Sequence, residues 1–243
     1  MKINVRQANS ALISLIEDFA QVIPVDANFL IPPDRSREVR GAQAITFHAF
    51  RKFWLDPLFV TFPYLAIHEA VYEELVTSSS RTYVKEKIEN GQMILLSDRD
   101  LNERESAYRS MIESRIAVHT AYDPEIDNKD DRGEVKSLAY IATKQLLYFC
   151  SRDSRALRLL SEPFKNSIGL FSVSAVQAYE LIYYMYVMRM ADPKELRVMY
   201  KYLYYLSEND RQVNPEWGQF IQAMQLLYQE FVNQSTGKPI PIY

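Results

Sequence analysis

Short apolar runs alternate with longer segments of helical spacing, and this alternation most strongly limits what the chain can fold into. The runs are VIPV at 22–25, QMILL at 92–96, LLYFC at 146–150 and IGLFSV at 168–173. Runs of this length, bounded by helical segments, are typical of buried strands. Strands that alternate with helices form mainly parallel sheets with helices on both faces. We therefore predict an α/β fold.

Apolar residues recur at three- and four-residue intervals between the runs, which predicts helices. The predicted helices cover residues 11–20 (with Ser10 as N-cap), 38–55, 64–76, 103–119, 135–146, 154–160 and 174–190. Residues 58–62, LFVTF, fit a helix or a strand. Beyond Asp192 the pattern is purely helical, with Pro193 in a first turn and a second helix near 220–232. We predict an N-terminal helix over 1–20, a main domain over 21–190 and a helical extension over 191–243.

Composition excludes several classes of protein. The 28 Lys and Arg residues nearly balance 31 Asp and Glu residues, so the chain as a whole does not attract nucleic acid, and any RNA binding needs a local basic patch. Cys150 is the only cysteine, which excludes an intramolecular disulfide and fits a reducing cytoplasm. The N-terminal segment carries Glu17 and Asp18 where a signal peptide needs apolar residues. Segment 168–190 contains too many polar residues for a membrane span. We expect a cytoplasmic protein.

Two aspartates directly follow apolar runs. Asp26 comes after VIPV, and Asp153 comes shortly after LLYFC. In an open parallel sheet both would lie at the carboxyl ends of strands, where ligand crevices form. Alternatively, each aspartate caps the following helix.

Two glutamates complete a candidate site. Glu74 falls within the apolar stripe of predicted helix 64–76, and a buried carboxylate needs a cation, a metal or a raised pKa. An ion pair with an arginine is the alternative. Glu134 lies in a first helical turn, which aims it toward the strand ends, although Asp131 and Glu134 also resemble a capping box.

Four converging carboxylates would repel one another unless cations neutralise them. Hard divalent cations such as Mg²⁺ and Mn²⁺ prefer oxygen ligands, whereas zinc sites favour Cys and His clusters, which this sequence lacks. The pattern therefore predicts a Mg²⁺ or Mn²⁺ site with Asp26, Glu74, Glu134 and Asp153 as ligands.

These segments resemble the motifs of PIN-domain ribonucleases. IPVDANFLI is similar to the first-strand motif, with Asp26 followed by Asn28. HEAVYEELV, DRGEVKSLAYIA and YFCSRDSRALRLL are similar to the segments that carry the second, third and fourth acids. The resemblance covers about 22–190. Pro24, inside a strand expected to be central, departs from it and implies a bulge or an early end of pairing. The long insert between the second and third acids is another departure.

The resemblance implies a PIN-like fold and metal-dependent cleavage of RNA, with the four acids as catalytic metal ligands. Asn28 would orient Asp26 or a metal-bound water, unless it only caps a turn. RNA is the expected substrate, with DNA not excluded. The arginines expected to contact phosphate are Arg35, Arg37, Arg152 and Arg155.

The biological role rests on analogy with the family. It suggests a bacterial toxin or defence effector, with an antitoxin or another protein as partner and a homodimer as one assembly. An inactive PIN-fold interaction module is the alternative, but retention of all four acids counts against it. A phosphatase with an aspartyl nucleophile would need D-x-D, where this chain has Asp26-Ala27-Asn28.

Overall fold

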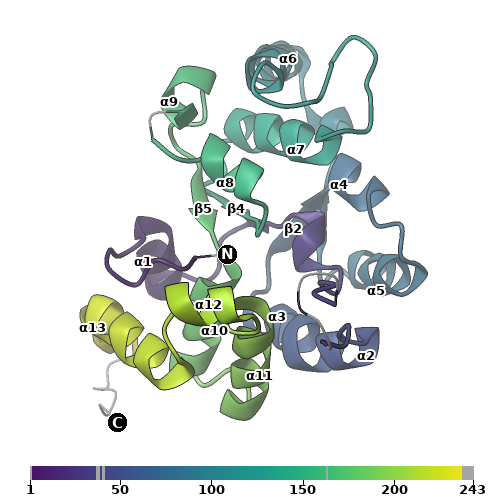
Figure 1. The fold of residues 1–243 in the computed structure, drawn as a ribbon. Coiled ribbons are helices and arrows are strands. Elements are labelled where there is room, and N and C mark those ends of the chain that lie inside the picture. Colours follow the sequence, from purple (N-terminus) through teal and green to yellow (C-terminus); the bar gives the residue numbers. More distant parts are fainter. Residues whose placement is uncertain (1, 37–38, 40–41, 163, 237–243) are drawn as a thin grey trace. The chain divides into compact units, whose positions relative to one another are not determined.

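The computed structural model describes residues 2–36, 39, 42–162 and 164–236 (Figure 1). The chain divides into two compact units, each assembled from separate stretches of sequence. The first unit comprises residues 1–21, 32–62 and 178–243, and the second comprises residues 22–31 and 63–177. All four predicted acids belong to the second unit.

The second unit is built on short parallel strands. Strands β1 (Ile23–Pro24), β2 (Leu65–His68) and β3 (Ile94–Leu96) form one sheet in that order, and β4 (Tyr148–Cys150) pairs with β5 (Ser174–Val176). All these pairs are parallel. A parallel bridge from Val25 to Cys150 joins β1 to β4, which gives the spatial order β3-β2-β1-β4-β5. The predicted α/β class with a parallel sheet is confirmed.

Pro24 explains why β1 and β4 meet through a single bridge. The N–H groups of Ile23 and Val25 donate to the carbonyls of Tyr64 and Ala66, on the β2 side. Backbone N–H groups alternate between the two sides of a strand, so the N–H of residue 24 would face β4. Proline has no N–H group. Pairing with β4 therefore begins only at Asp26, whose N–H donates to Cys150 O at 2.9 Å. The sequence predicts a bulge or an early end of pairing at Pro24, whereas the structure shows a late start of the pairing with β4.

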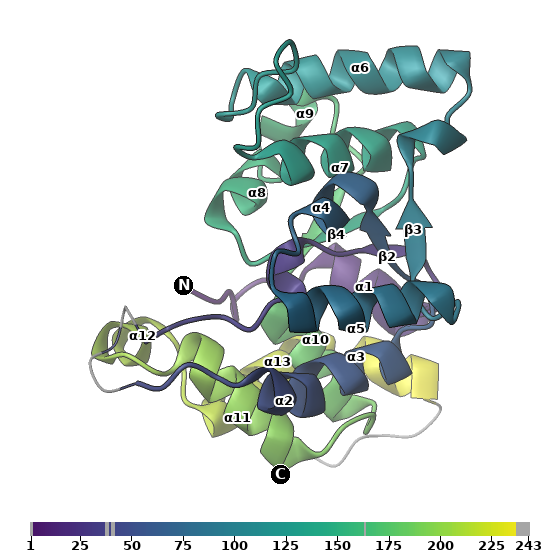
Figure 2. The ribbon, with the colours of Figure 1, turned by 90° about the vertical axis from the view of Figure 1, so that its right-hand side faces the viewer.

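Helices of the second unit follow most of the predicted positions. They are α4 (Glu69–Glu73), α5 (Ser78–Glu89), α6 (Glu103–Ala117), α7 (Arg132–Thr143), α8 (Ser154–Leu159) and α9 (Phe164–Ile168). The buried face of α7 forms the main core with α6, α8, α9 and β4, through residues such as Leu138, Ile112 and Phe149. Figure 2 shows α6 running across α7. This packing fixes the N-terminal turn of α7, where Glu134 lies.

Two sequence predictions in this unit are wrong. Residues 64–76 do not form one helix, because Leu65–His68 is a strand buried at every position and only Glu69–Glu73 is helical. The strand predicted at 168–173 instead lies at Ser174–Val176, which shortens the following helix at its start. In both places a short apolar run fits either structure, and the hydrogen-bonding partner decides between them.

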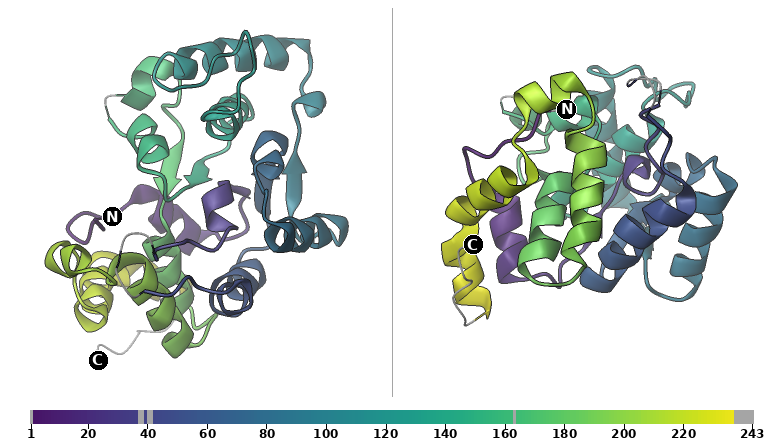
Figure 3. Two further views of the ribbon diagram at one scale, coloured as in Figure 1. Left: turned by 45° about the vertical axis from the view of Figure 1, so that its right-hand side comes forward. Right: turned by 60° about the horizontal axis from the view of Figure 1, so that its bottom comes forward.

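The first unit is helical. It contains α1 (Ser10–Glu17), α2 (Phe47–Phe50), the π-helical turn η2 (Arg51–Leu55), α3 (Asp56–Thr61), α10 (Ala178–Val187), α11 (Pro193–Tyr204), α12 (Glu208–Val213) and α13 (Trp217–Thr236). Figure 3 shows α10 and α11 side by side. Asn9, rather than the predicted Ser10, caps α1. The predicted helix 38–55 begins only at Phe47 among the described residues. No described helix has the length and hydropathy needed to cross a membrane.

Candidate functional site

The candidate site begins at two neighbouring strand ends. Asp26 follows β1, and Asp153 follows β4, the strand that β1 meets through Val25 and Cys150. From β1 the sheet continues to β2 and β3 on one side and to β4 and β5 on the other, so the strand order reverses between β1 and β4. Open α/β sheets bind ligands outside the carboxyl ends of their strands at such a point. The structure places both aspartates there.

Asp26 is held by two side chains. Its carboxylate is buried, with 7% of the residue exposed, and Oδ2 accepts hydrogen bonds from Ser151 Oγ at 2.7 Å and from the Asn28 amide. The Asn28 amide also donates to Ser151 Oγ at 3.0 Å, and Asn28 Oδ1 accepts from Arg152 N–H at 3.0 Å. Asn28 therefore contacts Asp26 directly, which is the position that its predicted orienting role requires. The predicted site lacks Ser151, although a hydroxyl directly after a buried strand is a signal for it.

Glu74 reaches the site from the end of α4. It is the C-cap residue and is only partly buried, not the centre of a buried stripe as predicted. Its Oε1 accepts a hydrogen bond of 2.8 Å from Gly133 N–H, in the first turn of α7. A Cβ at position 133 would overlap the Glu74 carboxylate. Arg132, the arginine whose charge acts on Glu74, pairs with Glu73 and Asp127 instead of with Glu74.

Glu134 lies in the first turn of α7, as predicted, with 7% of the residue exposed. Its Oε1 atom is buried and has no hydrogen-bond partner among the described residues. The predicted capping box does not form, because Asp131 has a left-handed backbone with φ of 55° and no capping hydrogen bond. A buried carboxylate oxygen without a donor is costly, and it is the atom a bound cation would satisfy.

Asp153 and Asp131 share one arginine. Asp153 caps α8 by accepting from Arg155 N–H at 2.7 Å, as the alternative interpretation from the sequence held. The Arg155 guanidinium lies 2.8 Å from Asp131 Oδ1 and 3.8 Å from Asp153 Oδ1. Asp131 Oδ2 also accepts from Ala121 N–H at 3.0 Å. Capping leaves the charge of Asp153 in place, so it does not exclude a second role.

Burial and neighbouring carboxylates raise the pKa values of Asp26, Glu74 and Glu134. Burial raises the pKa of Glu134 to about 8, and the charges of Asp26 and Asp153 add to that effect. Burial also raises the pKa of Asp26, and the charge of Asp153 adds to that effect. Burial raises the pKa of Glu74 in the same way, with an added effect from the charge of Asp26. Hydrogen bonds to both carboxylates lower the two pKa values but do not outweigh burial. The local positive charge from Arg132, Arg152 and Arg155 does not offset these effects. Such a set of groups is stabilised by an added divalent cation.

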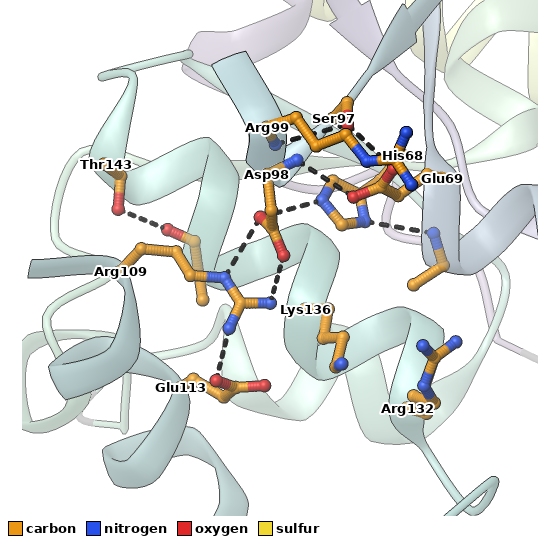
Figure 4. A network of polar contacts seen from close by, with 12 residues as sticks. His68, Glu69, Ser97, Asp98, Arg99, Arg109, Glu113, Arg132, Lys136 and Thr143 are labelled. Carbon is orange, nitrogen blue, oxygen red and sulfur yellow. Dashed lines mark hydrogen bonds and ion pairs between the residues drawn. The ribbon is translucent and has the colours of Figure 1, made fainter. Parts of the chain in front are cut away.

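A second cluster has closer ligand spacing. Among the described residues, only His68, Glu69 and Asp98 bring three ligand atoms within 4.8 Å of one another, and the four acids above do not. Figure 4 shows this cluster as part of a polar network. His68 Nδ1 accepts from Ala70 N–H at 3.3 Å, so a neutral ring carries its proton on Nε2, which lies 3.3 Å from Asp98 Oδ1. That nitrogen has no lone pair to offer a metal.

The carboxylates of this second cluster are also satisfied. Glu69 accepts from Ser97 Oγ at 2.7 Å and from Asp98 N–H at 3.0 Å, and Asp98 pairs with Arg109 at 2.8 Å. Burial acts to raise the pKa of Asp98, but His68 and Arg109 outweigh it and hold that pKa below its ordinary value. The cluster ties the end of β2 to the end of β3, and its donor set fits a hydrogen-bond network better than a metal site.

The four predicted phosphate-binding arginines have different settings. Arg155 is exposed beside Asp131 and Asp153, and Arg152 adjoins Asn28 through its backbone, with its guanidinium 3.4 Å from Ile31 O. Arg35 belongs to the first unit, where it is buried and pairs with Asp210 at 2.9 Å. Arg37 lies outside the described residues. Among the predicted arginines, the structure places Arg152 and Arg155 with the acids.

No protein-family model, no curated protein and no solved structure matches this chain.

Proposed function

We propose that the chain is a metal-dependent endoribonuclease with a PIN-like second unit. The observation that carries the proposal is Glu134 Oε1, a buried oxygen without a donor among the described residues, on a carboxyl group whose pKa is raised by burial and by the charges of Asp26 and Asp153. The strand order supports the proposal, since Asp26 and Asp153 follow the two strands at which that order reverses. The motif resemblance supplies the reaction class, and RNA is its expected substrate.

Asp26, Glu74, Glu134 and Asp153 would hold the metal. Their hard oxygen donors suit Mg²⁺ or Mn²⁺. When bound, such an ion lowers the pKa of a coordinated water and stabilises charge on a phosphodiester under attack. In the structure the four carboxylates are spaced more widely than a compact ligand set. Binding therefore requires that these side chains close toward one another.

The remaining residues prepare these acids. Ser151 and Asn28 both donate to Oδ2 of Asp26, which fixes the carboxylate and keeps it an acceptor. The Gly133 N–H orients Glu74 in the same way. Arg155 pairs with Asp131 but is exposed, so its guanidinium can also contact an RNA phosphate. A toxin or defence role, with an antitoxin as partner, rests on the resemblance alone.

The test is cleavage of labelled RNA and DNA of equal sequence with Mn²⁺ and with EDTA. Asp153→Asn is compared with Asp192→Asn, because both aspartates cap helices by accepting from the N–H two residues later at 2.7 Å. Asparagine preserves either cap. We expect Mn²⁺-dependent cutting of RNA that Asp153→Asn abolishes and Asp192→Asn retains. A folded, metal-supplied protein that cuts no substrate would support the inactive interaction module instead.

A further inference from the structure

The first unit carries a groove whose lining combines aromatic and cationic groups. It has a volume of about 570 Å³ and is lined by one face of α11, the two residues that follow that helix, Arg211 in the last turn of α12 and Glu216 just before α13. Val198, Lys201, Tyr202 and Tyr205 recur at three- and four-residue intervals, which places them on that one face. Leu206, Arg211 and a single acid, Glu216, complete the lining.

The two cations are available to a ligand. Within the described part of the chain, neither Lys201 nor Arg211 forms an ion pair with a carboxylate. Arg211 Nη2 donates only to Leu206 O at 3.2 Å, and its guanidinium carbon lies 6.0 Å from the centre of the Tyr205 ring. Two cations against one acid give the groove a local positive charge in a chain whose net charge is −3.

The two tyrosines have different roles. Tyr202 donates to Pro33 O at 2.9 Å and accepts from Ile45 N–H at 3.1 Å, so its hydroxyl anchors the groove wall. Tyr205 follows α11 directly and is partly exposed in the lining. Its ring offers a flat apolar face beside a guanidinium, and aromatic faces of this kind stack on nucleobases.

We propose that this groove binds one unpaired nucleotide of an RNA strand, an inference that rests on the proposed ribonuclease function. The base stacks on Tyr205 beside Val198, and Lys201 and Arg211 contact the adjoining phosphates. Glu216 accepts a hydrogen bond from a base that carries an exocyclic amino group, such as cytosine. The volume lies within the range of small-molecule sites. Charge complementarity selects a polyanion, and the aromatic wall selects a nucleotide over an acidic peptide.

The test measures the binding of fluorescein-labelled tetracytidylate and tetrauridylate to the full chain by fluorescence anisotropy. The buffer contains EDTA so that no cleavage occurs. We expect the single variant Tyr205→Leu to weaken tetracytidylate binding by about tenfold or more. We expect the same of the double variant that combines Lys201→Gln and Arg211→Gln. Glu216→Gln should reduce the preference for cytidylate. Lys201→Arg should preserve binding. Lys194→Gln and Arg197→Gln are matched controls, since both are exposed residues of α11 outside the groove lining.

The outcomes separate this inference from the proposed function. RNA binding that the groove variants weaken supports the groove, whether or not Mn²⁺-dependent cutting occurs. Binding that the groove variants leave unchanged, in variants with native circular dichroism spectra, overturns the groove even where the protein cuts RNA. Absence of measurable binding by the wild-type chain overturns it as well.

Discussion

Glu74 Oε1 accepts a 2.8 Å hydrogen bond from Gly133 N–H, and no side chain fits at position 133 without displacing that carboxylate. The contact joins the end of α4 to the first turn of α7, so it positions Glu74 beside the other acids. We predict that Gly133→Ala lowers Mn²⁺ affinity and RNA cleavage by about tenfold or more, as loss of an orienting contact does in other metal sites. Isothermal titration and a cleavage assay measure both effects.

Gly218→Ala is the matched control for that substitution. Gly218 is the second residue of α13, as Gly133 is of α7, and an added Cβ at Gly218 has no atom within 4 Å. Alanine there should leave activity unchanged and slightly raise the free energy of unfolding. Equal activity of the two variants would show that the Glu74 contact does not matter for the site.

Glu134 should make the metal-free protein less stable as pH rises. The unfolded chain releases this proton near pH 4.5, whereas the folded chain holds it to about pH 8. Between these values the unfolded state binds fewer protons, so the free energy of unfolding falls by up to about 1.4 kcal/mol per pH unit. Below and above that window the contribution is constant. Glu134→Gln should flatten this slope in urea unfolding measured in EDTA.

Glu103→Gln provides the comparison, because Glu103 is an exposed glutamate in the first turn of α6. It should leave the slope as in the wild type. A wild-type protein whose stability does not fall over this window, or a Glu134→Gln variant with the wild-type slope, would contradict the buried, proton-holding state of Glu134.

Ser151→Ala should destabilise the metal-free protein. The substitution removes the 2.7 Å donor to Asp26 Oδ2 at a fully buried position, which leaves a buried carboxylate less well satisfied. We expect a loss of about 1–2 kcal/mol in the free energy of unfolding, measured by urea denaturation. Ser137→Ala is the control, since the Ser137 hydroxyl is equally buried but has no hydrogen-bond partner in the part of the chain that the structure describes. A loss no larger than that of Ser137→Ala would count against the Ser151 contact.

Arg155→Gln should weaken RNA binding without weakening metal binding. Its guanidinium neighbours Asp131 and Asp153 and is exposed, which suits a phosphate contact. We predict a several-fold higher KM and a shallower salt dependence, by about one unit in the slope of log K against log salt. Arg104→Gln, an exposed arginine of α6, should change neither quantity. A fall in Mn²⁺ affinity would assign Arg155 to the metal site instead.

Sequence patterns located the strand-end acids because they depend on local order along the chain. Asp26 and Asp153 each follow an apolar run, and the parallel sheet brings such positions to one edge. The prediction of a helix at 64–76 is wrong because Leu65–His68 is buried at all four positions. No alternation of apolar and polar residues therefore marks this segment as a strand. Its pairing with β1 and β3 is a long-range property that periodicity does not contain.

Other features of the site depend on contacts between distant residues. Ser151 binds Asp26 across 125 positions of sequence, and Gly133 binds Glu74 across 59. The sequence predicts a capping box from Asp131 and Glu134, but Asp131 occupies the N-cap position of α7 with a left-handed backbone and no capping hydrogen bond, and its carboxylate pairs with Arg155. The PIN-like assignment, the metal and the four ligands remain predictions that measurement must decide.

A Mn²⁺ titration monitored by electron paramagnetic resonance tests whether the acids around Glu134 bind a divalent metal ion. The wild type, Glu134→Gln and Glu69→Gln are compared at one pH. Bound Mn²⁺ loses its free-ion signal, so the titration counts sites without any need for activity. We expect the wild type to bind Mn²⁺, Glu134→Gln to abolish that binding or weaken it at least tenfold, and Glu69→Gln to retain it. Binding that survives Glu134→Gln but is lost in Glu69→Gln, or no binding by the wild type, would contradict this expectation.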